Sequence, residues 1–144
     1  MKKSIIYYSK TGNTKSVVER FDGFERIAII PEDMNPNITN PVLIQKPSVD
    51  DAEYLIFASP VHGFQLARVM QVYLKQLNSL ENIVIDIFVT HQFPFACLGG
   101  NQALKQMEKL IESKNGVVRY KTSINWPSKK RENIIEQMLN LYIV

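Results

Sequence analysis

Cysteine is scarce in this sequence: Cys97 is the one cysteine among 144 residues. It cannot form a disulfide within the chain or supply paired thiolates, which excludes a disulfide-stapled secreted scaffold and a cysteine-rich zinc module. Long apolar runs are lacking too, since none approaches the roughly 20 residues that a membrane-spanning helix needs. The apolar run Ile5–Tyr8 is too short for a secretion signal. We therefore expect a soluble, cytoplasmic protein with no membrane partner.

Glycine, proline and charged residues are present in ordinary amounts. The chain has 6 Gly, 7 Pro, 22% charged and 45% hydrophobic residues, a composition typical of globular proteins and not of disordered or fibrous ones. This length buries one hydrophobic core, so we expect a single domain over residues 1–144. The net charge of +3 is spread along the sequence apart from Lys129, Lys130 and Arg131. That cluster is typical of a solvated helix start, so no nucleic-acid partner is expected.

Short apolar segments alternate with segments of helical periodicity. β-branched and aromatic residues predict buried strands at 3–8, 26–30, 53–60, 82–90 and 117–124. Apolar residues three and four positions apart predict helices from Thr14 and over 65–77, 101–113 and 130–142. Because residues 31–51 contain four prolines, a helix there should be short or absent. The alternation predicts an α/β fold, with helices on both faces of a parallel sheet.

The loop after the first expected strand is rich in polar side chains. It surrounds one glycine with hydroxyl, amide and lysine groups: Ser9, Lys10, Thr11, Gly12, Asn13 and Thr14. In an open parallel sheet, ligands bind beyond the carboxyl ends of the strands, where the winding direction reverses. Free backbone N–H groups and the positive end of the next helix suit a phosphate monoester. The same residue types are preferred helix caps, so capping alone is an equal alternative.

Two further loops carry aromatic side chains where polar ones are usual. The second loop contains Ser59, Pro60, Val61, His62, Gly63 and Phe64. The third loop runs to Gly100 and begins with Thr90, His91, Gln92, Phe93, Pro94 and Phe95. Exposed phenylalanines beside a phosphate site are favourable where they cover a flat apolar ligand. The alternative is that these rings fold back onto helix ends.

Several other activities lack their sequence patterns. G-x-x-x-x-G-K-[ST] and G-x-G-x-x-G are missing, which disfavours a nucleoside triphosphatase and a dinucleotide-binding unit. G-x-S-x-G, the hydrolase elbow, is missing as well. A phospho-accepting receiver domain would need an aspartate where the third strand ends in Ala58-Ser59-Pro60. His62, His91 and Cys97 lie on loops that should converge, but their spacing is not a metal motif. We predict no metal and no catalytic side chain.

The loop 9–14 resembles the FMN phosphate loop of flavodoxins, [ST]-x-T-G-x-T, and the resemblance to the short-chain type covers essentially the whole sequence. It implies a flavodoxin-like three-layer sandwich with a five-stranded parallel sheet of order 2-1-3-4-5. It also implies non-covalent FMN, with its phosphate on residues 9–14 and its ring between Pro60–Phe64 and Thr90–Phe95. Gly63 would match the glycine beside flavin N5, whose peptide turns over when the flavin is reduced.

The resemblance implies an FMN-binding electron carrier that serves redox partner proteins. Two alternatives stay open. One is an FMN-dependent NAD(P)H:quinone oxidoreductase or ribonucleotide-reductase-activating flavoprotein on the same fold, and the other is a flavin-free binding module. This chain is basic whereas flavodoxins are typically acidic, so docking onto positively charged partners is not expected. Positive charge near the site would also make the reduced flavin easier to form.

Overall fold

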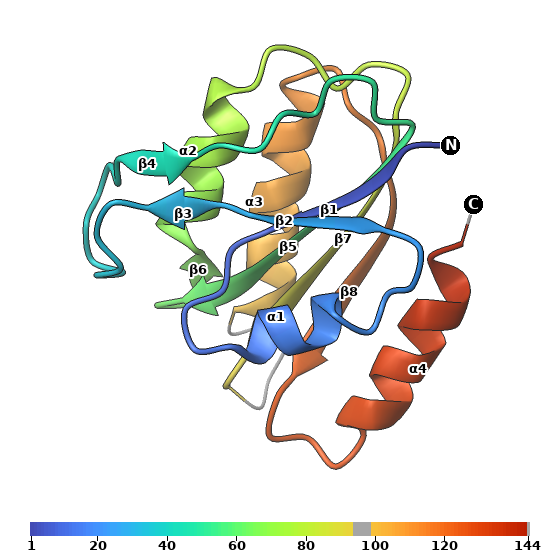
Figure 1. Ribbon diagram of the computed structural model, residues 1–144. Helices are drawn as coiled ribbons and strands as arrows, with labels where there is room; N and C mark the ends of the chain where they lie inside the picture. The colour runs from blue at the N-terminus through green and yellow to red at the C-terminus, as the bar shows by residue number, and fades with distance from the viewer. Residues whose placement is uncertain (94–98, 144) are drawn as a thin grey trace.

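Five parallel strands form a sheet through the middle of the molecule (Figure 1). The computed structural model describes residues 1–93 and 99–143. The strands are β1 (Lys3–Tyr7), β2 (Glu25–Ala28), β5 (Tyr54–His62), β7 (Val84–His91) and β8 (Val118–Asn125). They are ordered β2-β1-β5-β7-β8, and each neighbouring pair is parallel. This order confirms the predicted α/β fold and the predicted order 2-1-3-4-5 of the five parallel strands.

Helices cover both faces of this sheet and make three layers (Figure 1). The helices are α1 (Asn13–Val18), α2 (Arg68–Gln76), α3 (Gly100–Glu112) and α4 (Arg131–Leu141). Alternate residues of β5 point to opposite faces: Leu55 and Phe57 pack in the core with α2 and α3, and Tyr54 and Ile56 in the core with α1 and α4. None of the helices in the described ranges has the length and apolar character needed to cross a membrane.

The segment between β2 and β5 forms a small hairpin in place of a helix. Its strands are β3 (Ile30–Pro31) and β4 (Leu43–Gln45), which pair antiparallel. Pro31 is buried and Leu43 packs against the core, whereas Ile44 on the outer side is 68% exposed. The expectation of a short or absent helix over residues 31–51 is confirmed. The hairpin itself was not predicted, because prolines and polar residues leave this segment without the alternation of apolar and polar residues that indicates a strand.

The start of α2 differs from the prediction. Residues 65–77 have helical spacing, but Gln65–Leu66 forms β6, which pairs antiparallel with β5. Gly63 and Phe64 both have positive φ, +56° and +65°, so they make a two-residue turn that pairs His62 with Gln65. The helix therefore begins at Arg68. The prediction that residue 65 is helical is wrong because this turn takes precedence over the apolar spacing.

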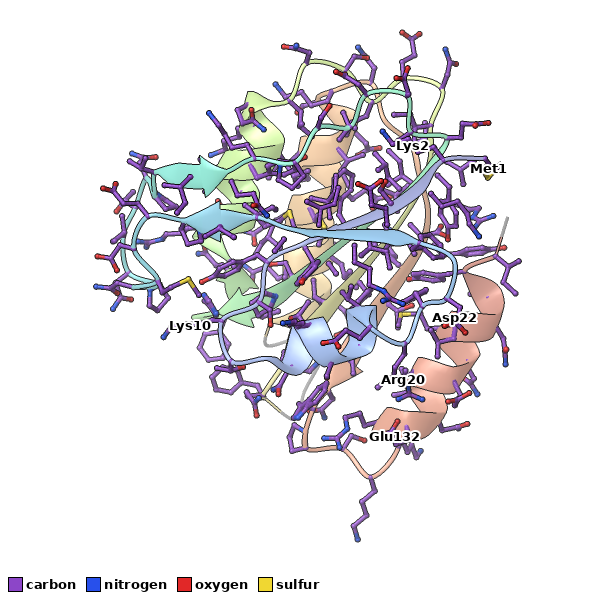
Figure 2. The ribbon with its side chains drawn as sticks, in the orientation of Figure 1. Met1, Lys2, Lys10, Arg20, Asp22 and Glu132 are labelled. Atoms are coloured by element: carbon purple, nitrogen blue, oxygen red, sulfur yellow. The ribbon has the colours of Figure 1, made fainter. Side chains whose placement is uncertain are left out.

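Two ion pairs tie α4 to Arg20, which follows α1. At the end of α1, Arg20 contacts Glu132 at 2.5 Å and also contacts Glu136, and Figure 2 shows Arg20 facing Glu132. The first of these pairs is the stronger cause of the raised pKa of Arg20. These partners are exposed, so they contribute at most about 1 kcal/mol each.

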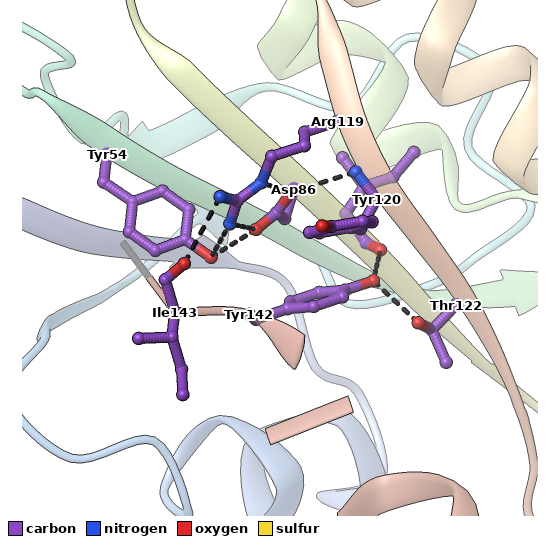
Figure 3. A network of polar contacts seen from close by, with 8 residues as sticks. Tyr54, Asp86, Arg119, Tyr120, Thr122, Tyr142 and Ile143 are labelled. Carbon is purple, nitrogen blue, oxygen red and sulfur yellow. Dashed lines mark hydrogen bonds and ion pairs between the residues drawn. The ribbon is translucent and has the colours of Figure 1, made fainter. Parts of the chain in front are cut away.

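A buried charge network connects β5, β7 and β8 on the face of the sheet that α1 and α4 cover (Figure 3). Asp86 on β7 has no exposed surface and accepts hydrogen bonds from Arg119 Nε at 3.1 Å and Nη2 at 2.6 Å. Tyr54 also donates its hydroxyl to Asp86, and burial together with this carboxylate raises the pKa of Tyr54. Next to it, the Tyr142 hydroxyl donates to Ile87 O at 2.6 Å. The network therefore links Arg119 of β8, and Tyr142 after α4, to the neighbouring strand β7.

Candidate functional site

Three loops leave the carboxyl ends of neighbouring strands at one edge of the sheet. We call residues 9–14 after β1 the first loop, residues 59–66 around the end of β5 the second loop, and residues 90–100 at the end of β7 the third loop. Of the predicted site residues, Pro94 and Phe95 lie outside the described residues, as does Cys97. The remaining predicted residues can be placed, and their contacts bring the three loops together.

The first loop leaves its backbone donors open. Among the described residues, no hydrogen bond uses the N–H groups of residues 10–13. Gly12 turns the loop with φ +98°, and a Cβ added there would meet no atom within 4 Å. Gly12 is also the N-cap of α1 and offers no side chain, so capping falls to Ser9, whose Oγ accepts from the Lys15 N–H at 3.2 Å. The loop therefore retains donors beyond those that capping needs.

The first and third loops are joined by two threonines. The hydroxyls of Thr14 and Thr90 lie 2.9 Å apart, and these residues are only 1% and 3% exposed. Because one hydroxyl must donate to the other, this pair is a fixed contact between α1 and the end of β7. The structure thus uses both predicted residues to position the loops relative to each other.

His62 of the second loop contacts Tyr8, the residue immediately before the first loop. Its ring lies edge-on to that of Tyr8, with 6.1 Å between ring centroids and 83° between ring planes. Burial is the main cause that lowers the pKa of His62, and the positive charge of Lys10 lowers it further. His62 is therefore a neutral, partly apolar surface at neutral pH.

The second and third loops meet at two phenylalanines. The rings of Phe64 and Phe93 are 4.4 Å apart between centroids, at 33°, and remain 43% and 40% exposed. The alternative that rings fold back onto helix ends is wrong for these two. Phe64 is also one of few non-glycine residues here with positive φ, a strained conformation that clusters at functional sites.

His91 supports the third loop from inside the fold. It is 3% exposed, and its Nδ1 donates to the Phe93 carbonyl at 2.6 Å, which leaves Nε2 as an acceptor with no partner among the described residues. Burial lowers the pKa of His91, and the hydrogen bond to Phe93 opposes that shift. We conclude that His91 orients Phe93, while its neighbour Gln92 lies on the surface.

The role of Gly100, the last residue of the third loop, was not predicted from the sequence. A Cβ on Gly100 would come within 2.1 Å of Ser123 Oγ and 3.1 Å of the His91 ring. Only glycine lets the start of α3 approach β7 and β8 this closely. The Gly99-Gly100 pair in front of a predicted helix was the available signal.

A cavity of about 410 Å³ opens between the second and third loops. Its volume is within the range of small-molecule pockets, roughly 300–1,000 Å³. Five predicted residues line it: Val61, His62, Gly63, Gln92 and Phe93. Pro36, Asn37, Gln65, Leu66 and Arg68 line it as well and were not predicted. Arg68 donates to the Asn37 carbonyl at 2.7 Å, which brings the loop of the β3–β4 hairpin to the cavity wall.

No protein-family model matches the sequence, and no curated protein matches it. Solved structures share its fold. A Bacteroides eggerthii protein proposed to be a flavoprotein has a TM-score of 0.73 at 16% identity, over 99% of this chain and 98% of that one. Oxidised flavodoxin 2 from Bacillus cereus gives 0.66 at 14% identity, over 99% and 97%. Fusobacterium nucleatum flavodoxin bound to flavin mononucleotide gives 0.62 at 17% identity, over 99% and 100%. This chain therefore has the flavodoxin-like fold that the first loop predicts.

Proposed function

We propose that this chain binds FMN non-covalently and carries electrons between redox partner proteins. The observation that carries the proposal is a set of three contacts that brings the loops together: Thr14 with Thr90, Phe64 with Phe93, and His62 with Tyr8 just before the first loop. The contacts set a loop with open N–H donors beside a cavity walled by aromatic and imidazole rings. The Fusobacterium nucleatum flavodoxin of the same fold is bound to flavin mononucleotide, which supports the assignment.

The first loop fits a phosphate. The N–H groups of residues 10–13 donate to no acceptor among residues 1–93 and 99–143, and the sequence from Tyr8 to Val18 contains Lys10 and Lys15 but no acidic residue. Charge-assisted hydrogen bonds from backbone N–H groups to an anion are stronger than neutral ones. In this proposal Ser9, Lys10, Thr11, Gly12, Asn13 and Thr14 hold the phosphate.

The second and third loops fit a planar ring. Phe64 and Phe93 offer exposed aromatic surface, and neutral His62 adds a further ring beside them. FMN, when bound, supplies the redox chemistry by accepting and returning one or two electrons. The residues of the chain bind it, orient it and exclude water. Pro60–Phe64 and Thr90–Phe95 would flank the ring, with Gly63 free to change its peptide orientation.

The experiment compares FMN with riboflavin, which has the ring but no phosphate. We expect FMN to bind the apoprotein and riboflavin to bind it at least tenfold more weakly, because the phosphate hydrogen bonds are lost, at about 1.5–3 kcal/mol for charged groups. Flavin fluorescence quenching measures both affinities. A protein that binds neither ligand, or binds both equally, would refute the assignment.

A matched pair of glycine variants locates the phosphate. Gly12 and Gly23 both have positive φ, +98° and +79°, but only Gly12 is in the first loop. Alanine at either position should cost similar stability, about 1 kcal/mol. Gly12→Ala should weaken FMN binding and leave riboflavin unaffected, whereas Gly23→Ala should affect neither. Equal effects of the two variants on FMN would place the phosphate elsewhere.

Turnover of NADH or NADPH distinguishes an electron carrier from the oxidoreductase alternative. A carrier loaded with FMN should not oxidise NADH or NADPH at a catalytic rate in the absence of a reductase. Steady-state absorbance of the nicotinamide measures this, and sustained turnover by the isolated protein would favour the oxidoreductase.

A further inference from the structure

Positive charge is concentrated at the edge of the sheet where the three loops lie. The chain segments 8–18, 59–74, 87–104 and 122–131 contain the carboxyl ends of β1, β5, β7 and β8 and the starts of the following helices. Within these bounds they contain no acidic residue and six basic ones: Lys10, Lys15, Arg68, Lys129, Lys130 and Arg131. The next residue, Glu132 in the first turn of α4, is paired with Arg20. The other 11 basic and 14 acidic residues leave the rest of the chain at −3. The fold thus adds Lys10, Lys15 and Arg68 to the cluster at residues 129–131, which was the one exception expected to a basic excess spread along the sequence.

Several of these cations lie on segments that contact the second and third loops, which carry the exposed aromatic pair. Arg68 lines the same cavity as Phe93. The backbone N–H of Trp126 donates to the His91 carbonyl at 2.8 Å, which holds the segment 126–131 beside the third loop. Lys10 lies on the first loop near His62, and Figure 2 shows it at the opposite end of the molecule from Met1 and Lys2. In the described ranges, none of the six forms an ion pair within 4 Å with an acidic residue.

We propose that this positive rim, with Phe64 and Phe93 at its centre, is the docking surface for an acidic partner protein. The proposal rests on the proposed function, since such a partner would meet the exposed side of the flavin site. Stable protein contacts combine an apolar centre with a polar rim, and the aromatic pair and the cations have this arrangement. Complementary charge accelerates encounter and rejects partners of the same sign.

The hairpin sets a boundary to this surface. The hairpin carries Glu32 and Asp33, which line a separate cavity with Met34 and Val42, whereas Glu132 beside the basic cluster is paired with Arg20. An acidic partner would be repelled there and attracted toward Lys129 and Lys130. The partner should therefore contact the second and third loops and the segment 126–131 more than the hairpin.

The test uses apoprotein and FMN-loaded protein with three labelled probes at low and at about 200 mM salt, where exposed charges are largely screened. The probes are an acidic [2Fe–2S] ferredoxin, basic cytochrome c and a single-stranded DNA oligonucleotide, and fluorescence anisotropy measures binding. We expect ferredoxin to bind at low salt, to weaken about tenfold at the higher salt and to outcompete the DNA. Cytochrome c should not bind.

Two charge-reversal variants localise the surface. Lys129→Glu/Lys130→Glu changes the rim, and Lys46→Glu/Lys75→Glu makes the same charge change near the far end of α2, where Lys46 and Gln76 line one cavity. The first variant should weaken ferredoxin binding about tenfold and the second should have little effect. The far-UV circular dichroism spectrum and melting temperature of both variants check that each is folded.

A redox-inert anion gives an independent map. Hexacyanochromate(III), which is paramagnetic, should broaden the amide signals of residues 9–15, 62–68 and 126–131 in an NMR spectrum. Equal loss from both double variants, tighter binding of DNA or of cytochrome c, or no ferredoxin binding would each overturn the proposal. Flavin absorbance is read separately, so a protein that binds FMN but fails these tests refutes only the docking surface.

Discussion

Phe64 occupies a backbone conformation that phenylalanine rarely adopts, and this makes its energetics testable. Its φ of +65° follows the +56° of Gly63 in the turn between β5 and β6. For an L-residue with a Cβ this region costs about 1–2 kcal/mol, because the Cβ crowds the following carbonyl. The tilted ring contact with Phe93, at 4.4 Å between centroids, offsets part of that cost, about 0.5–1.5 kcal/mol.

Two substitutions separate the strain from the stacking. Phe64→Gly and Phe64→Ala both remove the ring, but only glycine relieves the backbone. We expect the glycine variant to be more stable than the alanine variant by about 1 kcal/mol, and to unfold close to wild type because strain relief offsets the lost ring contact. Both variants should bind FMN more weakly, since the exposed ring is missing from the site.

The assay is urea unfolding of the apoprotein followed by circular dichroism, together with an FMN titration of each variant. Equal unfolding free energies for the glycine and alanine variants would show that no backbone strain is present. Unchanged FMN affinity in both would show that the Phe64 ring does not face the ligand. The two readouts are independent, so the strain and the ligand contact are tested separately.

Three further predictions concern groups around or away from the site. Asp86→Ala should destabilise the protein by about 3–5 kcal/mol, because Arg119 loses its buried partner, and urea unfolding measures this. The refolded variant should keep its FMN affinity, which flavin fluorescence measures. Gly100→Ala should cost about 1–3 kcal/mol by overpacking, and adding Ser123→Ala should recover part of it, unlike Ser123→Ala alone. Because burial lowers the pKa of His62 and of His91 below 6.5, their folded forms bind fewer protons than the unfolded chain, so stability is full above that value and falls as the pH drops below it. Unfolding free energies that rise on acidification toward about pH 5.5 would contradict the reasoning.

The local sequence was sufficient to predict the sheet and the first loop. The apolar residues of β1, β5 and β7 are consecutive because these strands are buried on both faces, and the polar turn 9–14 directly follows β1. The alternation of strands and helices predicted a parallel sheet covered on both faces. The strand order 2-1-3-4-5 came from the resemblance of residues 9–14 to the flavodoxin phosphate loop. The hairpin 30–45 could not be predicted, because its pairing depends on Leu43 reaching the core and not on any local period.

The remaining features depend on residues that are distant in sequence. Asp86 is a single charge in an apolar strand, and its partner Arg119 is 33 positions away, so only the register of β7 and β8 brings them together. The positive rim has the same origin: Lys10, Arg68 and Lys129 are far apart in the chain, and the parallel topology puts all three at one edge. The sequence indicated positive charge near the first two loops, but only the topology adds the cluster at residues 129–131 to the same edge.

The central claim, that the first loop grips the phosphate of FMN, is tested most directly by the ³¹P NMR signal of FMN added to the apoprotein. The account predicts a signal that shifts from that of free FMN and no longer titrates near the second phosphate pKa of about 6, and that Gly12→Ala reverses this. A signal that keeps the position and the pH dependence of free FMN would contradict it.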